Sequence, residues 1–272
     1  MKKGRELIDE INAYQPEKGK FGLWWLGQAS FVLKLGNKCL YIDPFFSDFE
    51  ARLTKPLFDA SLLTNADYIL GTHNHVDHID SKFWPGFSES SPQAKFIVPL
   101  FWRDALSEKF AIDASRMIGV GNDVAFEEDG LKISAIPSAH EFLDRDPDTG
   151  EYPAVGYVIE YEGTVIYHSG DCCLYEGLET RLKACKKFDL MMLPITGRSA
   201  AKFKVNFLGN MTYQEAVDLA GNVKPACAMP MHFDAFEGNT EDPTLFSDYL
   251  EAKYPGIPCV IPKHGELMVF PL

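Results

Sequence analysis

The sequence predicts an α/β protein that forms a single domain over residues 1–272. Segments rich in β-forming residues alternate along the chain with segments of helical periodicity, and no repeat or linker separates them. A chain of 272 residues, 46% hydrophobic and 24% charged, has the composition of one globular unit with a large core. Histidine and aspartate residues follow several of the β segments, and a loop that leaves a rigid strand can direct several side chains to one point.

The N-terminal half is predicted to begin with a helix and to continue with strands. Residues 6–13 carry a weak helical pattern, with three apolar side chains on one side. Residues 21–35 and 38–42 alternate as strands do, and Gly36-Asn37 between them is a hairpin turn signal. Further along, the pattern predicts a strand at 68–71, the beginning of a helix at 81–87, a strand at 94–99 and a helix at 103–110.

The C-terminal half continues the alternation. Thr212 and Glu215 have the spacing of a capping box, so a helix is expected to begin there and to end near Gly221-Asn222. The turn Glu162-Gly163 is expected to join two strands in a hairpin. Together the patterns predict strands at 132–136, 154–161, 164–168 and 226–231.

The segment from Thr72 to Asp80 contains three of the seven histidines of the chain and two aspartates. Neutral imidazole nitrogens and ionised carboxylates are the ligands of Zn²⁺ and similar divalent ions. The adjacent pairs His73 with His75 and Asp77 with His78 suggest two metal ions. The alternative is a solvated polar loop with chance histidines, which four potential ligands within six residues argue against.

Three further potential ligands, His140, Asp171 and His232, each follow a predicted strand. Taken singly, His140 or His232 is as compatible with a core or surface histidine as with a ligand. Together with the first motif they predict a two-metal centre, in which Asp171 and a water or hydroxide bridge the ions. The charged segment 141–153, which begins beside His140, is either a lid over this centre or a simple solvated connection. One ion is assigned to His73, His75 and His140, and the second to Asp77, His78 and His232.

These motifs resemble the metallo-β-lactamase superfamily of metal-dependent hydrolases. The resemblance runs from about Phe21 to the end of the chain, and the segments 25–31 and 40–44 are similar to the opening hairpin of the superfamily. It implies a four-layered αββα sandwich, in which two mixed β-sheets are flanked by helices. It also implies that Asp43 braces the metal loop rather than binding metal. The matching motifs are His73-Asn74-His75-Val76-Asp77-His78, Ser138-Ala139-His140, Ser169-Gly170-Asp171 and Met231-His232.

A narrower resemblance connects the chain with the L-ascorbate-6-phosphate lactonase branch. That branch opens a sugar-acid lactone with Mn²⁺ or Zn²⁺, which implies a small anionic substrate. Arg198 would bind its phosphate or carboxylate through a planar fork of donors, and Asn210 would orient the same segment or the substrate. Ser199 and Cys172 depart from the pattern of the branch, which bears on the substrate and not on the metals. The matching segments are 192–198, 209–220 and 239–243.

The expected chemistry is hydrolysis of an ester or lactone by a metal-bridging hydroxide, with two divalent ions as cofactors. Mixed histidine and carboxylate ligands suit Mn²⁺, Zn²⁺ and Fe²⁺ alike. Asp77 is either a pure ligand or also the group that passes a proton to the leaving oxygen. Two other functions stay open: a phosphodiesterase for a small phosphodiester that uses the same metals, and a metal-binding protein without catalysis.

Charge and hydropathy limit the partners that we expect. The formal net charge of −13 opposes sequence-independent binding to nucleic acid, and no apolar run is long enough to span a membrane. Residues 1–6 are charged and lack an apolar signal core, so we expect a cytoplasmic protein. The aromatic segment 45–49 makes a homo-oligomer contact an option.

Several other cysteines and histidines are expected to be structural. The six cysteines form no Cys-x-x-Cys pair and are expected to be reduced packing residues, with Cys172 closest to the metal centre. His168 is expected in the core or behind the ligands. His264, in a late turn, is expected to be structural rather than a general acid.

Overall fold

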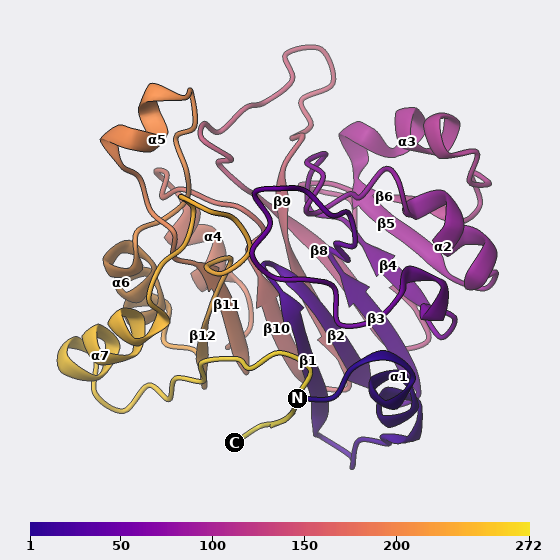
Figure 1. Ribbon diagram of the computed structural model, residues 1–272. Helices are drawn as coiled ribbons and strands as arrows, with labels where there is room; N and C mark the ends of the chain where they lie inside the picture. Colours follow the sequence, from indigo (N-terminus) through magenta and orange to yellow (C-terminus); the bar gives the residue numbers. More distant parts are fainter.

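Two β-sheets pack face to face in the computed structural model, which describes all residues from 1 to 272, and helices cover both outer faces (Figure 1). This is the predicted four-layered αββα sandwich. No helix is long and apolar enough to cross a membrane.

The first sheet has seven strands in the order β13-β1-β2-β3-β4-β5-β6. The strands from β13 to β3 are antiparallel, whereas those from β3 to β6 are parallel. Because parallel strands end at the same edge, the loops after β3 and β4 lie beside each other there. The strands are β1 (Phe21–Gly27), β2 (Ser30–Leu35), β3 (Lys38–Ile42), β4 (Tyr68–Leu70), β5 (Lys95–Pro99), β6 (Met117–Val120) and β13 (Leu267–Phe270).

The second sheet has six strands in the order β12-β11-β10-β9-β8-β7. β10, β11 and β12 are parallel, and β8 runs in the same direction because it is antiparallel to β9, which is antiparallel to β10. The loops after β8, β10 and β12 therefore leave the sheet at one edge. The strands are β7 (Phe126–Glu128), β8 (Leu131–Pro137), β9 (Val155–Tyr161), β10 (Thr164–His168), β11 (Leu190–Pro194) and β12 (Ala228–Met231).

The helices form the two outer layers (Figure 1). The first sheet is covered by α1 (Gly4–Ala13), α2 (Trp84–Ser90) and α3 (Arg103–Phe110), and the second by α4 (Leu178–Ala184), α6 (Tyr213–Val223) and α7 (Pro243–Lys253). Shorter helices lie in the connections: η1 (Ala60–Leu62), η2 (Leu100–Trp102) and α5 (Ala200–Lys204).

Apolar burial on both faces of the first sheet holds the layers together. One cluster of 46 buried residues fills the space between the sheets and continues to α6 and α7, and a second cluster of 24 residues joins the first sheet to its own helices. Every residue of β1, β2 and β3 is buried, because each of these strands has a layer on either side.

Most predicted elements are present within one to three residues. The helix at 103–110 and the strand at 164–168 have the predicted bounds, and the capping box closes with Thr212 N–H donating to Glu215 at 2.9 Å and Glu215 N–H donating to Thr212 at 3.2 Å. The prediction of one alternating run over 21–35 was wrong in detail, because a turn at Gln28-Ala29 divides it into β1 and β2. In the aromatic segment 45–49, Phe45 and Phe46 are buried within the chain itself.

Candidate metal centre

The histidine-rich loop leaves β4 and is fixed at its base by Asp43, the first residue after β3. Asp43 is fully buried and accepts hydrogen bonds from the backbone N–H and the hydroxyl of Thr72, both at 2.8 Å. Its carboxylate also accepts from Nδ1 of His78 at 2.6 Å. Asp43 therefore braces the loop, as the resemblance implied. Because it accepts the hydrogen bond from Nδ1–H of His78, Nε2 of that ring is left to face the centre.

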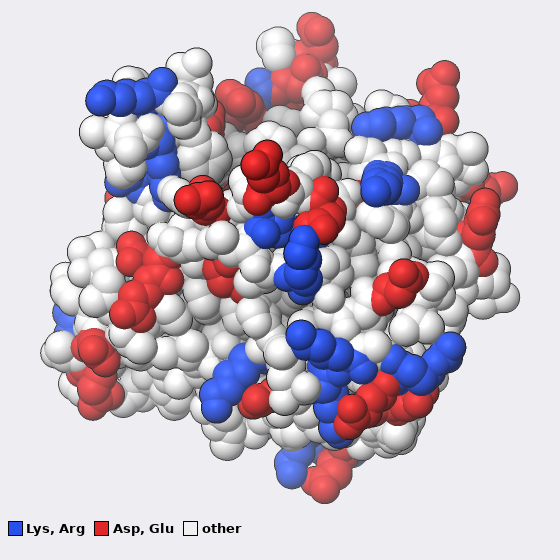
Figure 2. All heavy atoms as spheres, in the orientation of Figure 1, with Lys and Arg blue, Asp and Glu red and all other residues white.

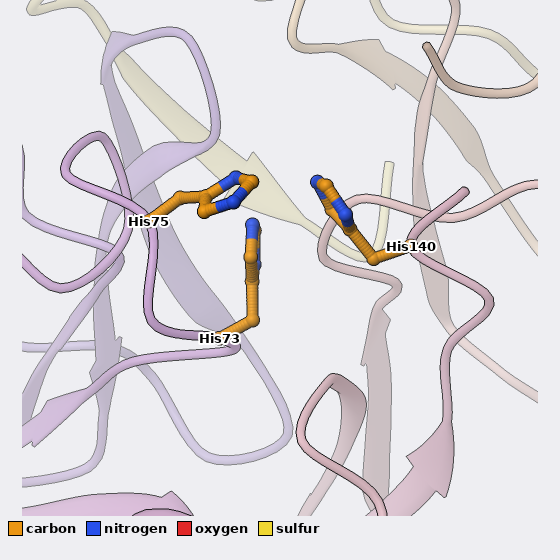
Figure 3. A group of neighbouring side chains, drawn as sticks. All are labelled: His73, His75 and His140. Carbon is orange, nitrogen blue, oxygen red and sulfur yellow. The ribbon is translucent and has the colours of Figure 1, made fainter. Parts of the chain in front are cut away.

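A first group of ligand atoms comes from His73, His75 and His140. Its three ligand atoms lie within 4.8 Å of one another, and the rings converge from two separate loops (Figure 3). His73 and His75 belong to the loop after β4, and His140 follows β8. Three imidazoles directed at one point are the donor set of a divalent transition-metal ion.

A second group comes from Asp77, His78 and His232, whose ligand atoms also lie within 4.8 Å of one another. Asp171, which follows β10, lies between the two groups. Its Oδ1 is 3.2 Å from Nε2 of His78, and its Oδ2 is 3.1 Å from Nε2 of His232 and 3.8 Å from Nε2 of His140. The position of Asp171 is compatible with the predicted bridging role, because its carboxylate lies beside His78 and His232 of the second group and beside His140 of the first.

Three buried polar atoms of this cluster make no hydrogen bond, as expected of atoms that bind cations. Nε2 of His73, Nε2 of His78 and Oδ1 of Asp171 are buried and have no hydrogen-bond partner. Buried polar atoms normally make hydrogen bonds of good geometry, so three that make none at one place are a strong exception. Two cations, one at each ligand group, would satisfy all three atoms once His78 has lost its Nε2 proton.

The ionisation of the histidines differs between the groups. Burial and the nearby imidazoles of His78 and His140 hold the pKa of His73 well below its ordinary value, so its ring is neutral and ready to coordinate. Burial also opposes the charge of His78 and His232, but the surrounding carboxylates outweigh it. The pKa of His78 is therefore raised well above its ordinary value, and that of His232 is raised to about 9.

The two carboxylates of the cluster are ionised. Burial alone would raise the pKa of Asp77 and of Asp171, but their contacts with His78 and His232 hold both pKa values well below the ordinary range. In the metal-free protein, imidazolium groups thus balance the buried carboxylates. A metal ion would replace these protons as the source of positive charge.

The two residues predicted to contact substrate lie away from the cleft beside the metal ligands. The guanidinium of Arg198 is hydrogen-bonded to Glu215, at the beginning of α6. Asn210 is buried, and its amide nitrogen lies 3.4 Å from Nδ1 of His232, behind that ring. Asn210 therefore lies behind the ring of His232 and does not line the cleft.

The cleft contains a buried cation, Lys202, which the sequence did not indicate. This cleft has a volume of about 380 Å³ and is lined by Lys202 from α5. Its lining also includes four of the candidate metal ligands: His75, Asp77, Asp171 and His232. Lys202 is only 8% exposed, and its ammonium donates to the carbonyls of Thr196 at 2.6 Å and Gly197 at 3.1 Å. Nothing in the sequence distinguishes Lys202 from the other basic residues of its segment, so its position in the cleft could not be predicted.

A second hollow adjoins the first ligand group. It has a volume of about 270 Å³ and is lined by His73, His75 and His140 together with Trp102 and residues of the loop 141–153. The loop therefore walls the centre rather than only connecting β8 with β9. Its residues in this lining are Phe142, Asp144 and Pro153.

The other singled-out residues have structural contacts. Cys172 is fully buried, and burial raises the pKa of its thiol to about 12. His168 is buried, with Nε2 2.9 Å from the Ala29 carbonyl. His264 stacks on Trp25 at a ring separation of 4.3 Å and lies 2.6 Å from Asp234.

Comparison with known proteins gives a consistent assignment. A family model described as a β-lactamase superfamily domain matches residues 39–233. A UPF0173 metal-dependent hydrolase of Thermococcus onnurineus is 31% identical, over 90% of this chain and 97% of the relative. Another, of Caldivirga maquilingensis, is 26% identical, over 92% of this chain and 98% of the relative.

Solved structures share the fold. Igni18, a metallo hydrolase of Ignicoccus hospitalis, superposes with a TM-score of 0.70 at 22% identity, and the match covers 93% of this chain and 99% of that one. An isothiocyanate hydrolase from Delia radicum gut bacteria gives 0.69 at 17% identity, with 91% and 98% covered. On the family match and the 31% identical relative, the chain belongs to the metallo-β-lactamase superfamily and, within it, to the UPF0173 family of metal-dependent hydrolases.

Proposed function

We propose that this hydrolase uses two divalent metal ions to open an ester or lactone bond in a small anionic substrate, a phosphorylated sugar-acid lactone such as L-ascorbate 6-phosphate being the candidate. The observation that carries the proposal is the cleft that Lys202 lines together with His75, Asp77, Asp171 and His232. The cleft combines an anion-binding group with the ligands of both candidate ions.

The dimensions of the cleft favour a small molecule. Its volume of about 380 Å³ is near the lower end of the range for small-molecule pockets, about 300–1,000 Å³. Val205, Phe207 and Phe236 supply an apolar wall. On the face shown in Figure 2, basic side chains are scattered among acidic ones, without the continuous basic stripe that a polyanion would require.

The charge of Lys202 suits the phosphate or carboxylate of such a substrate. Two of its three ammonium protons are directed at the carbonyls of Thr196 and Gly197, which leaves the third for a ligand. Burial lowers the pKa of Lys202, and the carboxylates of Glu241 and Asp171 act in the opposite direction. Because the ammonium is held by the backbone, little of its freedom is lost when an anion binds.

The mechanism assigns distinct tasks to the residues of the centre. When bound, the two ions lower the pKa of a coordinated water and polarise the scissile carbonyl. Asp77 is ionised and opens onto the cleft, so it can accept a proton from the attacking water and return it to the leaving alkoxide oxygen. Asp43 holds the tautomer of His78, Asn210 packs behind His232, and Lys202 orients the substrate by its anionic end.

The test is hydrolysis by protein loaded separately with Mn²⁺ and Zn²⁺. The substrates are L-ascorbate 6-phosphate, the same lactone without phosphate, and a small phosphodiester. Lys202→Met removes the charge but keeps the length of the side chain. We expect it to raise KM for the phosphorylated lactone by about 10–100-fold, the value of one charge-assisted contact, with a much smaller change for the lactone that lacks the phosphate.

Two controls accompany the test. Lys204→Met removes an exposed charge from the same short helix and should leave KM unchanged. His75→Ala removes a candidate ligand and should abolish turnover. Cleavage of the phosphodiester alone would replace the proposal with a phosphodiesterase, and bound metal without turnover of any substrate would contradict the assigned substrate class.

A further inference from the structure

Gln28 occupies an unusual position in the turn between β1 and β2. Its φ is 53°, in the left-handed region that residues other than glycine rarely adopt. Its backbone is held on both sides: the N–H donates to Asp234 at 2.8 Å, and the carbonyl accepts from the backbone N–H of His232 at 3.0 Å and from the Trp25 indole at 2.9 Å. Backbone conformations of this kind concentrate at functional sites.

The side chain of Gln28 is directed into the second ligand group. It is 1% exposed, and its amide nitrogen lies 2.7 Å from Nε2 of His232 and 3.1 Å from Oδ2 of Asp77. Both contacted atoms are candidate ligand atoms. Two donors bound to one ion at about 2.0–2.2 Å lie roughly 3 Å apart, so the end of the amide stands at the spacing of a further ligand.

The hydrogen bonding of this amide is incomplete. Oε1 of Gln28 is buried and has no partner. Once His232 and Asp77 donate electron pairs to an ion, those electron pairs no longer accept protons from the amide nitrogen. Rotation of the amide by about 180° exchanges its two ends and directs the oxygen, an electron-pair donor, at the same point.

We propose that the carboxamide oxygen of Gln28 is an additional ligand of the ion in the second group, an inference that rests on the proposed two-metal function. The second group then offers oxygens from Gln28, Asp77 and Asp171 with nitrogens from His78 and His232. The first group offers three imidazoles. The two positions therefore differ in chemistry: the oxygen-rich position favours Mn²⁺ or Fe²⁺, and the nitrogen-rich position favours Zn²⁺.

Metal binding tests the inference without reference to turnover. The stoichiometry and the stepwise affinities for Mn²⁺, Zn²⁺ and Co²⁺ would be measured by calorimetry and chelator competition, with the Co²⁺ absorption spectrum as a report of coordination number. Gln28→Leu keeps the approximate volume of the side chain and removes the oxygen. Gln93→Leu makes the same change at an exposed position remote from the centre.

We expect two ions in the parent protein and in Gln93→Leu. In Gln28→Leu, the affinity for one ion should fall at least about 10-fold, most strongly for Mn²⁺, and the Co²⁺ spectrum should report one ligand fewer. Unchanged affinity and spectrum in Gln28→Leu would overturn the inference and leave the proposed function standing. A parent protein that does not bind two ions would refute the proposed function itself.

Gln28→Glu keeps the test decisive if the leucine variant does not fold. A carboxylate at this position supplies an oxygen and a negative charge, so one ion should bind more tightly and the Co²⁺ spectrum should change. An unaltered affinity and spectrum in Gln28→Glu would also overturn the inference, because a side chain that only supports Asp77 does not enter the coordination sphere.

Discussion

Asp43 gives the sharpest test of how the fold prepares the ligands. Its carboxylate accepts three buried hydrogen bonds, two from Thr72 and one from His78, at 2.6–2.8 Å. In Asp43→Asn, the backbone N–H of Thr72 cannot reverse its direction, so the amide oxygen must continue to face it. The amide NH₂ then faces Nδ1 of His78, which must become an acceptor and carry its proton on Nε2 instead. That proton would block the atom that faces the metal centre.

The expected effect on metal binding follows from this change of tautomer. Partners that orient metal ligands are worth about 10–100-fold in affinity, or about 1.4–2.7 kcal/mol, so Asp43→Asn should weaken one of the two ions by this factor. The metal-free protein should lose about 1–3 kcal/mol of unfolding free energy, because charge-assisted bonds become neutral or unfavourable. Chelator competition and chemical denaturation measure the two quantities separately.

Asp67→Asn is the matched control for Asp43→Asn. Asp67 precedes β4, at the opposite end of that strand from Thr72, and its carboxylate accepts the backbone N–H of Cys39 at 2.7 Å. Its replacement should cost about 1 kcal/mol of stability without any change in metal affinity. Asp43→Asn protein that binds both ions as tightly as the parent would show that the tautomer of His78 is not set by this carboxylate.

Two further predictions concern the protonation of His232 and the space around the backbone of Gly170. Because His232 has a pKa of about 9 without metal, above the ordinary 6.5, its charge stabilises the metal-free fold fully below about pH 6.5, and this contribution is lost as the pH rises through 9. At pH 7.5 the binding of metal must therefore release the proton of His232. Calorimetry in buffers of different ionisation enthalpy would detect this release. A binding enthalpy that does not depend on the buffer would contradict the raised pKa of His232. Gly170 has a φ of 58°, and an added Cβ would lie 2.9 Å from Cβ of Thr72, so Gly170→Ala should cost about 2–4 kcal/mol in denaturation. Gly163→Ala, at positive φ but in open space, should cost only about 1–2 kcal/mol, and equal losses in the two variants would refute the steric argument.

The positions of the candidate ligands were predictable because they depend on a local feature, the ends of strands. His140, Asp171 and His232 each follow a short apolar segment, and strands that run in the same direction bring such positions to one edge of a sheet. The loop of His73 is similar, since it directly follows β4. Periodicity and residue type were enough to recognise these strands, and the opposed sheets then bring the two edges together.

The remaining parts of the site depend on contacts that local patterns do not encode. The turn at Gln28 was missed because β1 and β2 are buried on both faces, so their apolar residues run on without interruption from one strand to the next. Lys202 lies in the cleft because its ammonium is anchored by carbonyls of the preceding loop. Arg198 was predicted to bind the substrate because of its neighbours in sequence, but its pairing with Glu215 of the capping box is a tertiary contact.

The charge of the proposed centre is compatible with the anionic substrate that we propose for a protein whose formal net charge is −13. Two divalent ions would bring four positive charges to the cluster, and the ligand carboxylates of Asp77 and Asp171 balance only two of them. When Asp43 is also counted, one positive charge remains as long as the coordinated water has not lost its proton, and the field of this charge acts at short range in a medium that screens poorly. The distant surface carboxylates are screened by salt over about 8–10 Å and so affect the approach of a substrate more than its binding. Lys202, on the wall of the same cleft, adds a positive charge to the local field that an anion in the cleft would meet.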